Sequence, residues 1–483
     1  MRHLVWFRAD LRTIDNTALH EACLDPDAEV VAVYATTPGQ WREHDVAGCR
    51  IDFELRTLQQ LSRTLDTLGI PLRIVQADYF SELPHELLGL CTELGIDAVY
   101  FNRQYEVNEL HRDAEVGKAL GASGIVVHAY HDQCAIAPGR LLTADNRYYS
   151  VFTPFKRNWL KMILQEGLSL QPQPAPRRGR FTEASPIPAS VDGYISHITP
   201  EVAAAQWPAG EEAALQRLQT FCRKNLRSYA GQRDLPALDG TSTLSPYLAM
   251  GAISVRQCLN AAFAAKRKSL QGEADIDVWI AELCWRDFYK HVMVGFPRVC
   301  RHQPFRLETL PLPWRHDAAA FARWCEGRTG FPIIDAAMRQ LREIGWMHNR
   351  LRMLVAMFLT KDLFIDWRWG ERFFMQHLID GDLSANNGGW QWCASTGNDA
   401  APYFRVFNPT VQSQRFDADG SFIRRYVPEL AGLEGKRIHA PHEGGQLGLF
   451  SNYPEPMVDH GEAKDFAVDQ FRNLKLLKEA SLG

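Results

Sequence analysis

Tryptophan is concentrated in one part of this chain. Nine of the 13 tryptophans lie between Trp279 and Trp392, and two of them close the run NNGGWQW at residues 386–392. Indole rings stack on flat ligands and can relay charge, and a buried indole N–H must find a partner. A single tryptophan is more often core filler. A group of this size beside a glycine–asparagine loop favours a functional role.

Hydroxyl side chains gather at residues 240–246, where Thr241, Ser242, Thr243, Leu244 and Ser245 precede a proline. Hydroxyls and free backbone N–H groups at the start of a helix bind anions well, including a diphosphate. The alternative is an ordinary helix N-cap with no ligand.

A carboxylate lies among indoles at residues 279–286. Helical spacing puts Trp279, Glu282 and Arg286 on one face, with Trp285 at its edge. A carboxylate in such surroundings could hold or donate a proton. An ordinary Glu282–Arg286 helix pair is the competing interpretation.

A second polar helix face is expected at residues 346–363. Leu351 and Leu354 can face the core, which leaves Asn349, Arg352 and Met353 together on another face. Amide, guanidinium and thioether groups could form one wall of a site. The alternative is a solvated face, for which asparagine and methionine are poor choices.

The loop at residues 379–392 combines acceptors, amides and small residues. Asp380, Asp382 and Asn386 could bind the edge of a heterocycle, and the spacing does not fit an EF-hand. If Trp390 and Trp392 are helical, their side chains point about 200° apart, so one could face a buried partner and the other a cavity. Together, this loop and the hydroxyl segment suit a flat heterocycle that carries a diphosphate, which indicates a flavin nucleotide. Neither a P-loop nor a G-x-S-x-G motif is present.

Composition indicates a globular protein of two domains. The chain has 483 residues, 46% of them hydrophobic, and a net charge of −4. Residues 281–372 carry 15 Lys and Arg against 10 Asp and Glu, so this segment could bind phosphates or could simply be a solvated face. The ten cysteines show no zinc or disulfide spacing. With no signal peptide and no membrane-spanning run, a cytoplasmic protein is expected.

The first 130 residues alternate strand and helix patterns. Apolar runs predict strands at residues 3–7, 29–34, 72–76, 98–101 and 125–129. A helix between the second and third strands should end near Gly69. Continuous apolar strands separated by helices predict a parallel sheet covered on both faces, which is a Rossmann-like α/β domain. No G-x-G-x-x-G follows the first strand, so dinucleotide binding is not expected there.

Three segments are expected: an α/β domain at 1–131, a linker at 132–200 and an all-helical domain at 201–483. Residues 171–180 have the proline-rich composition of a linker. After residue 200 the pattern is helical. Helices are expected around Leu218, after Asp277 as an N-cap, from Pro332, and across residues 346–363.

Long sequence strings of this chain resemble the DNA photolyase/cryptochrome family, and within it the bacterial class I cyclobutane pyrimidine dimer photolyases. The strings are VWFRADLR at residues 5–12, QYEVNE at 104–109 and GFPIIDAAMR at 330–339, and the resemblance is densest from 327 to 409. It implies an α/β antenna domain, a connecting loop and a helical domain that binds U-shaped FAD.

The resemblance also implies site residues. Flavin contacts on the phosphate and ribityl side would be Tyr229, Thr241, Ser242, Thr243, Leu244 and Ser245. Contacts around the rings would be Trp279, Asn349, Arg352, Asp380, Asp382 and Asn386. Asn386 would lie beside flavin N5, and Arg352 would pair with Asp380 over the ring. An electron relay would run outward through Trp390, Trp367 and Trp314.

The implied substrate is UV-damaged DNA. Lesion contacts would be Arg233, Glu282, Trp285, Asn349, Arg350, Met353 and Trp392. Trp285 and Trp392 would sandwich the flipped dimer, Glu282 would bind its carbonyl, and Arg233 and Arg350 would hold phosphates. Excited FADH⁻ would lend one electron to the cyclobutane ring, which splits and returns it.

The implied antenna is 5,10-methenyltetrahydrofolate, bound by His44, Asn108 and Glu109, with Arg301 where the family often has lysine. Three alternatives remain. A cryptochrome has the same fold without repair, but plant cryptochromes place Asp at the Asn386 position. A (6-4) photolyase would have histidines in place of Asn349 and Met353. A flavin oxidoreductase would need a nicotinamide site. A monomer is expected, with no membrane partner.

Overall fold

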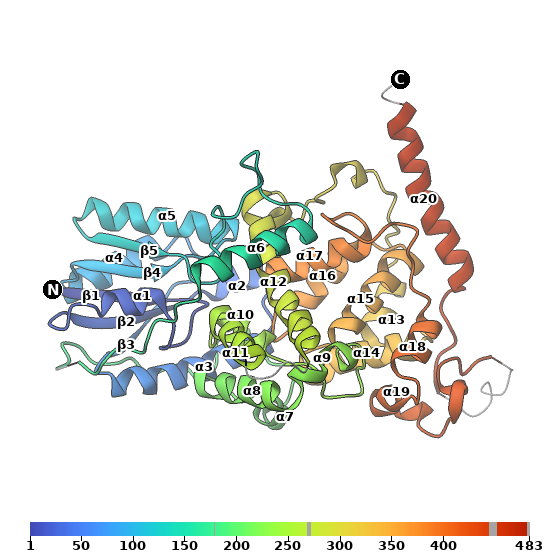
Figure 1. Ribbon diagram of the computed structural model, residues 1–483, viewed down its shortest axis with the longest axis horizontal. Coiled ribbons are helices and arrows are strands. Elements are labelled where there is room, and N and C mark those ends of the chain that lie inside the picture. The colour runs from blue at the N-terminus through green and yellow to red at the C-terminus, as the bar shows by residue number, and fades with distance from the viewer. Residues whose placement is uncertain (178, 268–271, 444–451, 481–483) are drawn as a thin grey trace. The chain divides into compact units, whose positions relative to one another are not determined.

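The structure of the chain is a computed structural model that describes residues 1–177, 179–267, 272–443 and 452–480. The chain forms two compact units. The first comprises Met1–Arg227, Ser242–Pro297 and Ile379–Asp382, and the second comprises Ser228–Thr241, Arg298–Leu378 and Leu383–Gly483. Figure 1 shows their helices and strands along the chain.

A five-stranded parallel sheet forms the core of the first unit. Its strands are β1 (Arg2–Phe7), β2 (Glu29–Thr36), β3 (Leu72–Gln76), β4 (Ala98–Asn102) and β5 (Val126–Tyr130). They lie in the order β3-β2-β1-β4-β5, and every neighbouring pair is parallel. The predicted strands and the Rossmann-like topology are confirmed.

Helices cover both faces of this sheet, as the apolar strands predict. The helices that follow the strands are α1 (Thr17–Ala22), α2 (Pro38–Glu43), α3 (Gly48–Thr67), α4 (Leu83–Leu94) and α5 (Val107–Ala122). Val5 and Phe7 pack on one face with α1 and α3, while Leu4 and Trp6 pack on the other with α4 and α5. The helix α3 ends as expected, because Gly69 has φ +71°.

Residues 132–200 are less irregular than predicted. They contain α6 (Phe152–Glu166), which buries Phe155, Trp159 and Ile163 at helical spacing. This helix packs against α12 (Glu273–Gly295) of the same unit. The proline-rich segment after it has no regular structure where it is described, and position 178 lies outside the described residues.

The rest of the first unit is helical. Its other helices are α7 (Pro200–Gln206), α8 (Glu211–Lys224), the 3₁₀ turn η1 (Leu226–Ser228), α10 (Ser245–Met250) and α11 (Val255–Arg267). Helix α12 does not begin after Asp277, as the sequence predicts. It begins at Glu273 behind Gly272, with Glu273 and Asp275 in its first turn. Acidic residues are favourable at this end of a helix, and Asp277 instead pairs with Lys266 at 2.8 Å.

The second unit is built from helices. They are α9 (Tyr229–Gln232), η2 (Val299–Arg301), η3 (Leu307–Thr309), α13 (Ala318–Glu326), α14 (Pro332–Ile344), α15 (Asn349–Met357), the π-helix η4 (Phe358–Asp362), α16 (Trp367–Met375), α17 (Leu383–Ala394), α18 (Pro409–Phe416), α19 (Ser421–Tyr426), η5 (Pro428–Leu430), η6 (Gly435–Ile438) and α20 (His460–Ala480). Pro332 occupies the first turn of α14, as predicted.

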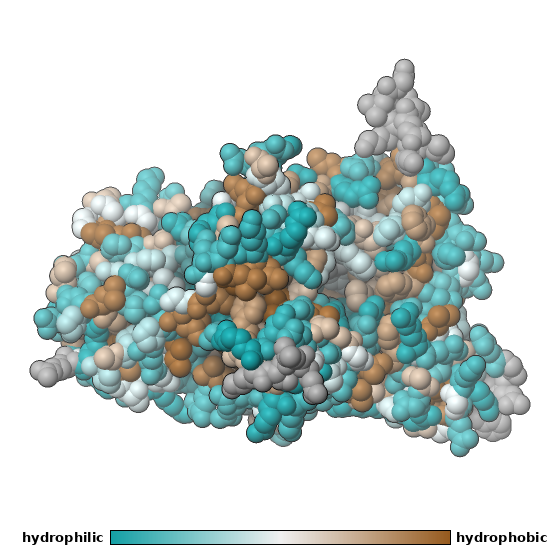
Figure 2. Space-filling model, in the orientation of Figure 1, coloured by the Kyte–Doolittle hydropathy of each residue, from teal (hydrophilic) through white to brown (hydrophobic). Residues whose placement is uncertain are grey.

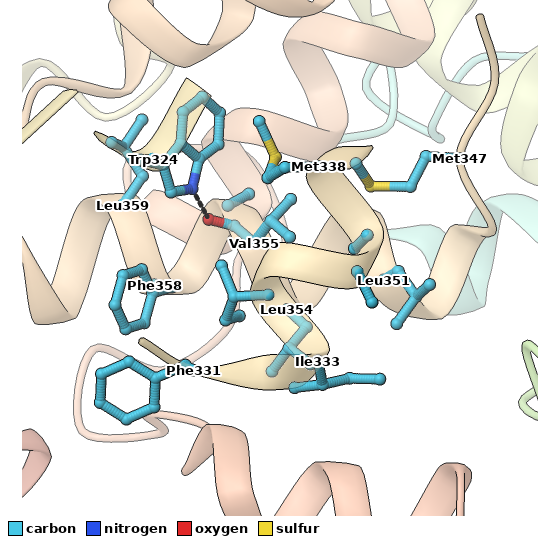
Figure 3. Packing of buried hydrophobic residues seen from close by; sticks show 14 of the residues in the cluster. Trp324, Phe331, Ile333, Met338, Met347, Leu351, Leu354, Val355, Phe358 and Leu359 are labelled. Atoms are coloured by element: carbon cyan, nitrogen blue, oxygen red, sulfur yellow. Dashed lines mark hydrogen bonds between the residues drawn. The ribbon is translucent and has the colours of Figure 1, made fainter. Parts of the chain in front are cut away.

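A large apolar cluster forms most of the core of the second unit. Figure 3 shows Trp324 of α13 within it, donating its indole N–H to the Val355 carbonyl of α15 over 3.2 Å. Fully buried residues such as Leu351 and Val355 lie on the core face predicted for residues 346–363. The helix begins at Asn349 rather than Trp346, because His348 is its N-cap.

Candidate functional site

The hydroxyl segment lies at the start of α10. Leu244 is the N-cap residue, whose apolar side chain makes no cap hydrogen bond, and Thr243 has φ +47°. The Thr243 hydroxyl donates to the Ser242 carbonyl over 2.9 Å and accepts from Arg217. The segment therefore combines hydroxyls with a neighbouring guanidinium, which suits an anionic ligand. Arg217 lies far away in sequence and was not predicted.

Indoles and a carboxylate are presented by α12. Trp279 is buried and packs against Phe221, with ring centroids 5.0 Å apart. Trp285 is half-buried and lies face to face with Phe152 of α6, at 3.6 Å between centroids. Glu282, on the helical turn between them, is also half-buried. On the face shown in Figure 2, hydrophobic side chains gather beside the polar surface of α6.

The alternative interpretation of α12 is an ordinary Glu282–Arg286 pair, so the partners of Arg286 are relevant to it. Its guanidinium donates to the Gln133 carbonyl over 2.6 Å and to the Leu248 carbonyl over 3.5 Å. It also lies 3.7 Å from Asp287. Arg286 therefore contributes to packing within the first unit.

The two aspartates at 380 and 382 belong to the first unit. Asp380 is buried. Asp382 forms an ion pair of 3.0 Å with Lys290, a buried lysine of α12 that also lies 3.5 Å from Glu106. Burial lowers the pKa of Lys290, and the two carboxylates more than offset this and raise it overall. Lys290 is therefore a charged group that holds Asp382 in place.

In the second unit, α15 presents the predicted polar face. Asn349 is exposed, and Arg352 and Met353 are half-buried. Arg352 donates from Nε to the Met347 carbonyl over 2.8 Å. Arg350 donates from Nε and Nη2 to Asp234, at 3.2 and 2.9 Å. Asp234 was not predicted, because nothing in the local sequence links it to residue 350.

The N-cap of α15 is a buried histidine. His348 accepts from the Arg350 backbone N–H at Nδ1, over 3.2 Å. Burial, together with the neighbouring Arg350, Arg352 and Arg233, lowers the pKa of His348 to about 4. The ring is therefore neutral at neutral pH, and its Nδ1 lone pair is available for the cap.

Helix α17 carries the amide and the two indoles. The Asn386 amide donates to the Glu371 carbonyl over 2.9 Å, which fixes its orientation. Trp390 is buried and packs on Phe374, with centroids 5.0 Å apart, while Trp392 is half-buried. Both residues lie on one helix, so their side chains leave it about 200° apart, and the two indoles differ in burial.

The three predicted relay tryptophans share one core. Trp390 and Trp367 belong to the apolar cluster of the second unit, and half-buried Trp314 packs against it. Trp314 also contacts Phe364 and Phe471, with centroids 4.8 and 6.5 Å apart. The cluster contains a further buried indole, Trp324, whose centroid lies 6.1 Å from that of Trp390.

The three predicted antenna residues meet in the first unit. Nε2 of His44 lies 2.9 Å from the Asn108 amide nitrogen and 3.1 Å from that of Gln40. Two amide donors at Nε2 require its lone pair there, which places the ring proton on Nδ1. Nδ1 lies 3.6 Å from Glu109. Burial, with Glu106 nearby, raises the pKa of Glu109 to about 7.

Neither a metal-binding cluster nor a membrane-spanning helix is found among the described residues. No cluster of His, Cys, Asp or Glu there is arranged to hold a metal ion. No helix there has the length and hydropathy needed to cross a membrane.

Comparison with known proteins places the chain in a family. The DNA photolyase domain matches residues 3–177, and the FAD binding domain of DNA photolyase matches residues 279–473. Deoxyribodipyrimidine photo-lyases of Salmonella typhimurium and Escherichia coli are each 45% identical over 96% of this chain and 96% of theirs. The chain therefore belongs to the DNA photolyase family.

Solved structures agree with this assignment. A bacterial class III photolyase from Agrobacterium tumefaciens has a TM-score of 0.85 and 34% identity, and the match covers 98% of each chain. A Synechocystis sp. PCC6803 cryptochrome also has a TM-score of 0.85, with 28% identity over 97% of this chain and 99% of that one. The predicted fold, α/β followed by a helical FAD-binding domain, is confirmed.

Proposed function

We infer that this chain is an enzyme that repairs cyclobutane pyrimidine dimers in DNA with light. The observation that carries this inference is its 45% identity, over 96% of its length, to proteins named deoxyribodipyrimidine photo-lyase. FAD is its cofactor, through the FAD binding domain at residues 279–473. When bound and reduced, the flavin supplies one light-excited electron to the dimer and receives it back.

The chemistry of residues in each unit supports the proposed flavin contacts. Residues 241–245 offer hydroxyls beside Arg217 for the diphosphate, with Tyr229 as a further contact. Trp279 and Asp380 are buried, and Asp382 is held by Lys290, so these groups are preorganised to contact the rings. Asn349, Arg352 and Asn386 supply amide and guanidinium groups. The fixed Asn386 amide suits a hydrogen bond to the flavin N5 region.

The lesion contacts are aromatic, acidic and basic groups. Trp285 and Trp392 are both half-buried, so each indole has a surface on which a flipped base can stack. Glu282 hydrogen-bonds the dimer carbonyl and stabilises the charge that arrives there. Met353 and Asn349 contact the dimer, and Arg233 and Arg350 hold the phosphates on either side.

Trp390, Trp367 and Trp314 pass electrons from the protein surface to oxidised flavin. Their presence in or against one apolar cluster supports this role. The antenna is methenyltetrahydrofolate at His44, Asn108 and Glu109, with Arg301 as a further contact. The arrangement of His44 between two amides and a buried carboxyl supports this site.

We further expect a monomer that acts in the cytoplasm. The division into an antenna domain at 1–131, a linker at 132–200 and a helical domain at 201–483 stays a prediction.

The test is a repair assay on the purified protein with its chromophores. We expect flavin absorbance, and loss of thymine dimers from an oligonucleotide in blue light under reducing conditions. Glu282→Gln should slow repair more than it weakens dimer binding. A light-sensing protein without repair is the second candidate, favoured by the similarity to the Synechocystis cryptochrome. Bound flavin with dimers that persist in the light would decide for that candidate.

A further inference from the structure

One carboxylate lies against two of the arginines proposed to bind DNA. Asp234 accepts from Nε and Nη2 of Arg350 at 3.2 and 2.9 Å. Nε of Arg233, its neighbour in sequence, lies 4.0 Å from the same oxygen. All three residues belong to the second unit.

Arg350 is held more firmly than an ordinary surface arginine. Its guanidinium lies over the Phe416 ring, with Cζ 4.6 Å from the centroid. Its side chain is 19% exposed and that of Asp234 is 33% exposed. Because Asp234 takes the Nε and Nη2 edge of the planar group, the Nη1 end is left to donate to a further acceptor.

The surrounding charge is positive. Arg233, Arg350 and Arg352 all lower the pKa of buried His348, and the carboxylate of Asp234 raises it. Three guanidinium groups and one carboxylate therefore lie near the same buried ring in this part of the second unit. Asp234 lowers the positive charge that Arg350 and Arg233 offer to a phosphate backbone.

The charge and the orientation of these arginines affect binding to undamaged DNA and binding to dimer-containing DNA differently. Binding to undamaged duplex depends mainly on the number of phosphates neutralised and is insensitive to the exact position of an arginine. Binding to a flipped dimer also needs each arginine at a defined place on the bent backbone. A carboxylate that lowers net charge and fixes Arg350 therefore weakens the first kind of binding and favours the second.

We propose that Asp234 is a positioning residue that sets the discrimination between damaged and undamaged DNA. Its carboxylate offsets the charge of Arg350 and Arg233 and holds Arg350 in the orientation that a dimer-containing backbone requires. This proposal rests on the proposed repair function, and it adds a group that itself touches neither base nor phosphate.

The test compares binding of the holoprotein to thymine-dimer duplex and to undamaged duplex of the same sequence, by fluorescence anisotropy over a series of salt concentrations. In Asp234→Asn, affinity for undamaged duplex should rise about fivefold, and its salt dependence should steepen by up to about 0.9 in the log–log slope. Affinity for dimer duplex should rise less or fall, so the ratio of the two affinities drops.

The matched control is Glu429→Gln. Glu429 pairs with Arg339 at 2.7 Å in the same unit, and Arg339 is not among the proposed DNA contacts. This variant makes the same change in net charge and should leave the affinity ratio unchanged. An equal drop in both variants would show that only total charge matters, and an unchanged ratio in D234N would overturn the proposal.

Two further variants separate charge from position. Asp234→Glu keeps the charge but not the geometry, so dimer affinity should fall while undamaged affinity stays at the wild-type level. A change in both affinities, or in neither, would contradict the proposal. This test can be made even if D234N does not fold. In an Arg350→Gln background, D234N should have a much smaller effect. If the wild type neither prefers nor repairs dimer DNA, the proposed function fails instead.

Discussion

Trp285 lies face to face with Phe152, with ring centroids 3.6 Å apart and an angle of 8° between the planes. One face of this indole is therefore covered by the chain itself. A flipped base could stack only on the other face. The contact joins α6 to Trp285, one of the proposed lesion contacts, so this helix of the predicted linker supports that indole.

Phe152→Leu tests that support. Leucine fills most of the space but cannot stack, so dimer affinity should fall about three- to tenfold, the value of one aromatic contact. Fluorescence anisotropy with a thymine-dimer duplex measures this affinity. Phe155→Leu is the control, because Phe155 is fully buried in the same helix and packs on Phe288. It should lower the melting temperature and leave dimer affinity intact; equal affinity losses in both variants would contradict a specific role for Phe152.

Trp390→Phe tests the electron relay. Phenylalanine is far harder to oxidise than tryptophan, so photoreduction of oxidised FAD should be abolished, while chemically pre-reduced enzyme repairs normally. The absorbance of the flavin during illumination measures photoreduction, and the repair assay measures the activity of the pre-reduced enzyme. Trp324→Phe is the control, since it removes a buried indole 6.1 Å from Trp390 that is outside the proposed relay. Loss of both activities in W390F would show that Trp390 is needed for more than the relay.

Gly370→Ala tests the packing of Trp390. A Cβ at position 370 would lie 2.1 Å from Cη2 of Trp390, so the indole would have to move. We expect slower photoreduction and a loss of about 1–3 kcal/mol in the free energy of unfolding, as for an overpacked core. Gly432→Ala has open space at its Cβ and should change neither quantity. Normal photoreduction in G370A would mean that the position of Trp390 is not critical.

His348 predicts a pH dependence of stability. Its pKa is about 4 in the folded protein and about 6.5 when unfolded, so the unfolded chain binds more protons between these values. The free energy of unfolding should therefore fall as pH drops from 6.5 to 4, by up to about 3 kcal/mol from this group. His348→Asn can keep the helix cap without titrating, and denaturant unfolding should show a shallower slope. Parallel curves for the two proteins would exclude His348 as the source.

The sequence predicted the features that depend on local pattern. The five strands follow from short apolar runs, and α14 follows from Pro332 and the apolar residues behind it. The different exposure of Trp390 and Trp392 follows from helical geometry alone. Such patterns are visible within a few residues, which is why they could be interpreted without the fold.

Features that depend on distant partners were missed. Asp234 contacts a residue 116 positions away, and Arg217 lies beside Thr243 from another helix. Helix α6 has a periodic apolar face at Phe152, Phe155, Trp159 and Ile163, which is a local signal for a helix, although the proline-rich segment after it is typical of an irregular linker. The start of α12 was misplaced because Asp277 fits an N-cap locally, although Gly272 and two acidic residues precede it.

The most direct test of light-driven repair is a single-flash experiment on pre-reduced protein mixed with a thymine-dimer oligonucleotide in the dark. We expect the ultraviolet absorbance of thymine to recover after each flash and not in the dark, while the flavin absorbance returns to its starting value. A lasting change in flavin absorbance without recovery of thymine would contradict the account, because the electron would then have left the flavin without splitting the dimer.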